Sequence, residues 1–150
     1  MIKVDLILKN AEILTMDQDF KIFNPGAVAI KGSGIMAVGL ESEIITNYQS
    51  EKVIDCEGKV LMPGLVNAHT HVPMTLLRGL SDDLRLDVWL MGYMMPVERE
   101  FVSPDFVELG TKLACAEMIR SGITSFADMY YFEEHVARAT SQVGMRAVCS

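Results

Sequence analysis

The sequence lacks any long hydrophobic run, and this absence argues against a membrane-spanning or exported protein. No apolar stretch approaches the ~18 to 20 residues that a membrane-spanning helix needs. The first residues, MIKVDLILKNAE, carry charged and polar side chains where a secretion signal has an apolar core. We therefore expect no membrane partner and a cytoplasmic location.

Cysteines and basic residues are also scarce. Cys56, Cys115 and Cys149 are odd in number and form no C-x-x-C pair, which argues against a disulfide framework or a zinc knuckle and favours free thiols. Lys and Arg number 13 against 20 Asp and Glu, giving a formal net charge of -7. A phosphate backbone requires clustered basic residues, so we expect no nucleic-acid partner.

What the sequence does contain is enough apolar residues for a core, since 50% of its 150 residues are hydrophobic. Residues 1–60 predict a small all-β unit with a bulge near Asn10, a turn at 24–26 and a hairpin at 32–34. A short helix or loop is expected within 41–50. Nothing in this part suggests chemistry.

After residue 60 the pattern changes to strands that alternate with helices. The expected elements are a strand at 65–72, a helix from Ser103 to Gly122, a strand at 123–129, a helix at 133–143 and a strand at 145–149. This alternation predicts a parallel, right-handed sheet. An inward apolar stripe is predicted on the first long helix, formed by Phe106, Leu109, Leu113, Ala116 and Ile119.

The segment VLMPGLVNAHTHVPMTLLRGL, residues 60–80, carries the clearest chemical signal. Alternate residues of a strand face the same side, so His69 and His71 are expected to point one way and Thr70 the other. Two imidazoles at a strand end can reach one cation, and neutral imidazole suits zinc. On spacing alone, two polar residues at a strand end remain the alternative.

The whole string around this pair resembles the metal-dependent amidohydrolase superfamily: Pro-Gly before an apolar strand, H-x-H at its end, then PMTLLRG. The likeness runs from Val4 to the end of the chain. Within the superfamily the sequence is most similar to the single-metal branch and, in that branch, to the 5′-methylthioadenosine/S-adenosylhomocysteine deaminases.

The resemblance implies an α/β fold, a (β/α)8 TIM-type barrel beside a small β-sandwich built from both ends of the chain. Residues 1–60 would belong to the sandwich and residues 61–150 to the first β/α units of the barrel. A complete barrel typically takes ~250 residues, so we expect this sequence to be the N-terminal portion of a longer protein. The family likeness also implies a homo-oligomer.

Metal ligation by His69 and His71 leaves a catalytic zinc site short of ligands, since such sites keep three or more. His135 is expected on a solvated helix face rather than at the metal. The resemblance implies one divalent ion, zinc with iron as the alternative, and places two further His, an Asp and a proton-shuttling Glu beyond residue 150.

Trp89 and Glu98 are the candidate substrate-binding residues. The stretch from Trp89-Leu90 to Pro96-Val97-Glu98 resembles the family's W-L…P-x-E segment, in which the Glu accepts hydrogen bonds from ribose hydroxyls. A carboxylate can accept two hydroxyl donors of a cis-diol. An exposed charged run is the alternative for Glu98, and a core position is the alternative for Trp89 and the nearby methionines.

Asp128 ends the second barrel strand and is expected to hydrogen-bond loop groups there, while Arg78 has the pattern of a structural salt bridge. The function that the resemblance implies is hydrolytic deamination of an adenosine-type nucleoside by metal-activated water. The alternatives are a guanine- or cytosine-type deaminase, a triazine chlorohydrolase, and a non-catalytic chain that needs the rest of the barrel.

Overall fold

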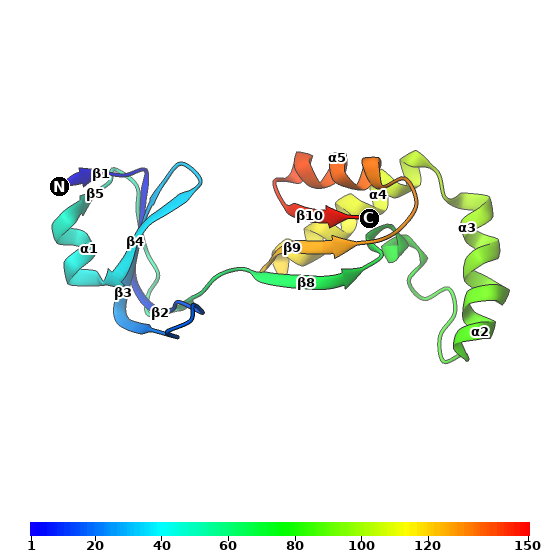
Figure 1. The fold of residues 1–150 in the computed structure, drawn as a ribbon, viewed down its shortest axis with the longest axis horizontal. Coiled ribbons are helices and arrows are strands. Elements are labelled where there is room, and N and C mark those ends of the chain that lie inside the picture. Colours follow the sequence, from blue (N-terminus) through cyan, green and yellow to red (C-terminus); the bar gives the residue numbers. More distant parts are fainter. The chain divides into compact units, whose positions relative to one another are not determined.

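The chain folds as two units, Met1–Pro63 and Gly64–Ser150, which are described separately. The computed structural model describes all residues from 1 to 150 (Figure 1). The division lies a few residues after the predicted boundary at residue 60. No helix combines the length and apolar character that a membrane crossing requires.

The first unit is built on a five-stranded sheet in the order β4-β3-β2-β6, with β7 also pairing with β2. Strands β1 and β5 pair separately, and one short helix, α1, makes the unit not purely β. The elements are β1 (Ile2–Lys3), β2 (Leu6–Leu14), β3 (Ile22–Lys31), β4 (Gly34–Leu40), α1 (Glu41–Asn47), β5 (Tyr48–Gln49), β6 (Val53–Asp55) and β7 (Val60–Leu61).

The hairpin predicted at 32–34 is confirmed, since β3 and β4 pair antiparallel across it. The turn predicted at 24–26 is wrong, because β3 continues through these residues. Four residues of β3, from Phe23 to Gly26, oppose three of β2, from Ala11 to Ile13, and this bulge accommodates a proline that has no N–H for the ladder. Asn10, where a bulge was predicted, has a positive φ at a shift in register.

The second unit has a three-stranded parallel sheet in the order β10-β9-β8, which confirms the predicted parallel arrangement. Helices α4 and α5 cover one face of it (Figure 1), and their buried side chains meet Phe126 of β9 in the core. The elements are β8 (Leu65–Thr70), the 3₁₀ helix η1 (Val72–Leu77), α2 (Leu86–Val88), the π-helix η2 (Trp89–Met94), α3 (Met95–Phe101), α4 (Pro104–Arg120), β9 (Ile123–Asp128), α5 (Glu133–Val143) and β10 (Arg146–Cys149).

Helix α4 begins where the sequence predicts, with the Ser103 side chain accepting a hydrogen bond from the Phe106 N–H at 3.2 Å. The predicted inward stripe is wrong, because Leu109 and Leu113 are 60% and 41% exposed. The buried face instead carries smaller residues, namely Val107, Gly110, Thr111, Ala114, Cys115 and Met118. This helix packs so closely on η1 that small side chains, rather than the largest apolar ones, face inward.

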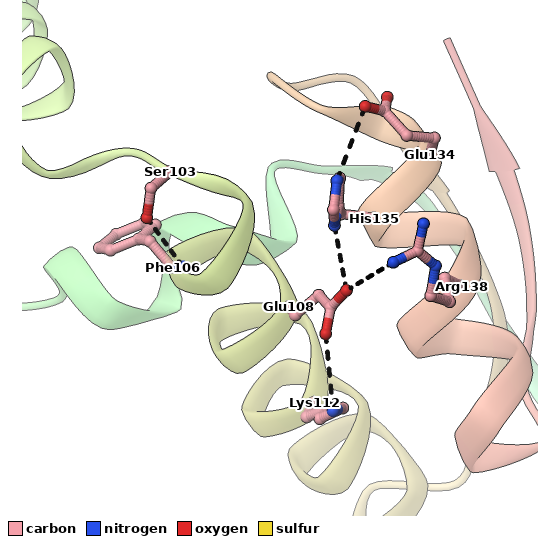
Figure 2. Close-up of polar contacts among 7 residues, drawn as sticks. All are labelled: Ser103, Phe106, Glu108, Lys112, Glu134, His135 and Arg138. Atoms are coloured by element: carbon pink, nitrogen blue, oxygen red, sulfur yellow. Dashed lines mark hydrogen bonds and ion pairs between the residues drawn. The ribbon is translucent and has the colours of Figure 1, made fainter.

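His135 does not lie on a solvated face as predicted, because it joins α5 to α4. Its Nδ1 lies 3.0 Å from Glu108 Oε1, and its side chain is only 18% exposed. Arg138 and Lys112 flank the same carboxylate (Figure 2), and the His135 hydrogen bond holds the pKa of Glu108 below its ordinary value. The His135 ring therefore has a structural role, because it links α5 to α4 through Glu108.

Candidate active site

His69 and His71 present their rings to the same side of β8. The ring centroids are 5.1 Å apart with the planes at 78°. Thr70, between them, turns the other way, with its hydroxyl 2.6 Å from Asp128 Oδ1 and 2.9 Å from the Ala127 carbonyl oxygen. His71 lies just beyond the last residue of the strand, where it caps η1. Strand alternation therefore brings two imidazoles together at the carboxyl end of a parallel strand.

A backbone contact fixes the tautomer of His71. Its Nδ1 lies 2.6 Å from the Met129 carbonyl oxygen, which can only accept a hydrogen bond. The N–H must then be at Nδ1, which leaves the Nε2 lone pair free. Metal-bound histidines in proteins use this arrangement, in which the second ring nitrogen donates to a carbonyl or carboxylate.

Two imidazoles on one side of a strand end are a donor set that fits a zinc ion. No group of three or more His, Cys, Asp and Glu side chains in this chain is arranged to hold a metal. A catalytic zinc uses three or more protein ligands, so His69 and His71 alone do not complete such a site.

Asp128 of β9 forms hydrogen bonds with the residues on either side of His71. The side chain is buried, and its Oδ1 accepts hydrogen bonds from the Val72 N–H and the Thr70 hydroxyl. Its other oxygen is buried without a partner. The prediction that this carboxylate bonds loop groups is confirmed.

Glu133 lies beside Asp128 at the same end of the sheet. It accepts a hydrogen bond from the Tyr130 N–H. Burial raises the pKa of Glu133, and the nearby Asp128 carboxylate raises it further, against the effect of that hydrogen bond. Burial also raises the pKa of the adjacent Cys149 thiol to about 11. The neutral forms of Glu133 and Cys149 are therefore favoured at this end of the sheet.

Glu98 and Trp89 line one cavity with His71. The cavity has a volume of about 360 Å³ and its wall is mostly apolar; it is lined by His71, Met74, Trp89, Leu90, Glu98, Met129, Tyr130 and Tyr131. Glu98 is half-buried, and its Oε1 accepts a hydrogen bond from the Tyr130 hydroxyl at 2.8 Å. Three of the four predicted site residues, His71, Trp89 and Glu98, therefore share this cavity, whereas His69 does not line it.

Sequence reasoning missed Met74, Met129 and Tyr130. Among the methionines near Trp89, Met94 is buried, which agrees with the core alternative, and Met91 is 70% exposed, while Met74 lines the cavity. A usable signal was the position of Met129 and Tyr130 directly after the carboxyl end of a predicted parallel strand, where ligands of α/β sheets bind. Arg78 has a structural role, since its guanidinium makes two hydrogen bonds to Glu117, at 2.7 and 3.0 Å.

Comparison with known proteins gives a consistent result. Residues 60–150 match the profile of the Amidohydrolase family. The chain is 50% identical over 146 residues to a 5-methylthioadenosine/S-adenosylhomocysteine deaminase of Syntrophobacter fumaroxidans, covering 97% of this chain and 33% of the relative. It is 47% identical, again over 146 residues, to a 5′-deoxyadenosine deaminase of Methanosarcina mazei, covering 97% of this chain and 33% of that relative.

A solved structure supports the same relationship. The crystal structure of an adenosine deaminase from Xanthomonas campestris with bound zinc superimposes with a TM-score of 0.94 at 38% identity. The match covers 98% of this chain and 34% of that one. The chain therefore spans about a third of the length of the curated relatives and of the structure that it matches.

Proposed function

Because the chain belongs to the amidohydrolase family, we propose that it contributes to an enzyme that hydrolytically deaminates an adenosine-type nucleoside, 5′-methylthioadenosine or S-adenosylhomocysteine. The names of the relatives at 42–50% identity support this substrate class. The single observation that carries the proposal is the cavity in which Glu98, Trp89 and His71 meet. In it the Glu98 carboxylate and the Trp89 ring share one cavity wall with His71, a candidate metal ligand, which supports the proposal.

The proposed fold is a (β/α)8 barrel, of which β8, β9 and β10 are the first three strands, with the first unit as part of a β-sandwich. The parallel order of these strands and the position of His69 and His71 at their carboxyl ends support this fold. His69 and His71 would hold one divalent ion, zinc as in the Xanthomonas structure. When bound, such an ion supplies hydroxide at neutral pH.

Glu98 and Trp89 have separate proposed roles in the cavity. The Glu98 carboxylate accepts hydrogen bonds from the ribose hydroxyls, since only one of its oxygens is engaged by Tyr130. Trp89, with Met74 and Leu90, forms an apolar wall against the adenine or the thioether. His71, held by the Met129 carbonyl, lies at the wall where the reacting ring would sit.

The test uses the full-length enzyme. This term means the present chain together with a segment that corresponds to the part of the relatives which the chain does not span. Glu98→Ala should raise KM for adenosine nucleosides by about 10- to 100-fold, the loss expected for hydrogen bonds to a charged group. The KM for a free adenine-like base should change far less, because a base has no ribose.

Glu100→Ala is the matched control, since Glu100 is an exposed carboxylate on the same helix. Equal losses on nucleoside and free base would contradict the ribose role. Such a result would favour a guanine- or cytosine-type deaminase or a triazine hydrolase, whose substrates lack a ribose.

A further inference from the structure

The dipeptide Met129-Tyr130 contacts two residues of the candidate site, His71 and Glu98. Its Met129 carbonyl oxygen accepts from His71 Nδ1 at 2.6 Å, and its Tyr130 hydroxyl donates to Glu98 Oε1 at 2.8 Å. These two residues directly follow β9. One short piece of backbone therefore connects the candidate metal ligand to the candidate ribose-binding carboxylate.

The Tyr130 side chain is itself held in place. Its backbone N–H donates to the Glu133 carboxylate, and its ring packs edge-on against Tyr131 with centroids 5.1 Å apart. Burial is the main cause that raises the pKa of the Tyr130 phenol, and the Glu98 carboxylate raises it further. The phenol is thus protonated throughout the working pH range and acts as a hydrogen-bond donor.

Glu98 lies on α3, and no other hydrogen bond to its side chain is formed within the chain. A glutamate side chain has several rotamers that become fixed only when a partner holds them. The Tyr130 hydroxyl occupies one lone pair of Oε1 and leaves Oε2 free. A carboxylate held in this way is ready to accept two neighbouring hydroxyl groups without first being ordered.

We propose that Tyr130 is a positioning residue for Glu98, and that it sets the preference of the enzyme for nucleosides carrying both the 2′- and 3′-hydroxyl groups. The inference rests on the proposed ribose role of Glu98. It adds a residue that contacts the carboxylate rather than the reacting atoms. Loss of the phenol leaves Glu98 present but unfixed, so the diol is bound less tightly while the chemistry at the base continues.

The experiment compares Tyr130→Phe with wild type in the full-length enzyme, with Tyr93→Phe as control, because Tyr93 is an exposed tyrosine outside the cavity. Substrates are 5′-methylthioadenosine, its 2′-deoxy and 3′-deoxy analogues, and free adenine. We expect Tyr130→Phe to raise KM for the diol nucleoside about tenfold, with kcat nearly unchanged and little change for adenine. Discrimination between the diol and the deoxy analogues should shrink by a similar factor.

A double-mutant cycle separates positioning from a general structural role. Glu98→Gln combined with Tyr130→Phe should bind the diol no worse than Glu98→Gln alone, since the phenol acts through the carboxylate. Fully additive effects, or equal losses on adenine and nucleoside, would overturn the inference. Replacing Tyr130 with 4-aminophenylalanine, which keeps a donor at this position, should restore most of the lost affinity.

Two further outcomes distinguish a failure of the Tyr130 positioning role from a failure of the Glu98 ribose role. If Glu98→Gln raises the nucleoside KM and Tyr130→Phe does not, the positioning role is wrong and the proposed function stands. If Glu98→Gln has no nucleoside-specific effect, the ribose role fails and this inference fails with it. Should Tyr130→Phe not fold, the Raman doublet that reports tyrosine hydrogen bonding should change on Glu98→Ala, and an unchanged doublet would overturn the inference.

Discussion

The Asp128 carboxylate accepts a hydrogen bond from the backbone N–H of Val72 at 2.7 Å. Val72 directly follows His71 and begins η1. Because the Thr70 hydroxyl reaches the same oxygen at 2.6 Å, one buried carboxylate contacts both residues that flank His71, the side chain of Thr70 and the backbone of Val72. Asp128 therefore holds the two neighbours of His71, while the imidazole itself is held by the Met129 carbonyl oxygen.

Replacing Asp128 with Ala should destabilise the second unit. The substitution leaves the buried Val72 N–H without an acceptor, at a cost of about 1–3 kcal/mol. Urea unfolding monitored by Trp89 fluorescence measures this, because Trp89 is the single tryptophan and reports on the second unit alone. In the full-length enzyme, zinc affinity should fall by about 10- to 100-fold, as for other partners that orient metal ligands.

Thr70→Val separates the two contacts of Asp128. It removes the hydroxyl donor and keeps the Val72 N–H bonded, so its effect should be the smaller one. A loss from Thr70→Val as large as that from Asp128→Ala would show that the Val72 contact contributes little.

Loss of either His69 or His71 should reduce zinc binding by the full-length enzyme to a substoichiometric level. In the proposed site each ring is one of the zinc ligands, so its loss removes one of the bonds that hold the ion and weakens binding. Elemental analysis after dialysis is the measurement. His135→Ala is the control, because this third histidine is engaged by Glu108 and should leave the zinc content unchanged.

The 150-residue chain by itself should hold zinc weakly, with less than one ion per chain after dialysis. Its two imidazoles form no larger cluster with other metal-binding side chains. Tight binding of one zinc per chain would contradict this assignment and would require a third ligand from these residues.

The order of elements and the histidine pair could be predicted because they depend on local pattern. The alternation of His69, Thr70 and His71 follows from strand geometry alone. The buried face of α4 could not be predicted, since both faces are apolar and the choice depends on how closely η1 approaches Gly110. The link between Tyr130 and Glu98 joins residues distant in sequence, and no local pattern encodes such a contact.

The stability of the second unit should fall as pH rises from about 4.3, the ordinary glutamate pKa. The folded chain raises the pKa of Glu133, mainly by burial, so its carboxyl binds a proton more tightly when folded than when unfolded. Folding is therefore favoured at low pH by this group, and the advantage is lost as pH rises to the folded-state pKa. Glu133→Gln should remove this part of the pH dependence and make the variant relatively more stable at pH 7.

The glutamine oxygen can still accept from the Tyr130 N–H, so the substitution tests the charge rather than the hydrogen bond. Urea midpoints between pH 4.5 and 8 give the comparison. Glu134→Gln is the matched control, because the neighbouring Glu134 side chain is 67% exposed and should leave the pH dependence unchanged. Parallel curves for wild type and Glu133→Gln would show that Glu133 is not the group responsible.

Gly110 of α4 packs directly against the backbone of Pro73 in η1. A Cβ atom there would lie 2.6 Å from the Pro73 carbonyl oxygen and 2.8 Å from the Pro73 Cα atom. Both are backbone atoms, which cannot rotate away as a flexible side chain would. Gly110→Ala should therefore push η1 away from α4 and lower the free energy of unfolding by about 1–3 kcal/mol. Urea unfolding followed by Trp89 fluorescence measures this loss.

The displacement should also reach the metal site, because Pro73 is separated from His71 only by Val72. Gly110→Ala in the full-length enzyme should weaken zinc binding, although Gly110 touches neither histidine. Gly92→Ala is the control: its added Cβ would meet only Val88 Cγ1 at 4.0 Å, and alanine favours a helix over glycine. If Gly110→Ala lowers stability and leaves zinc affinity as in wild type, then Asp128, and not the packing of α4 against η1, is what fixes His71.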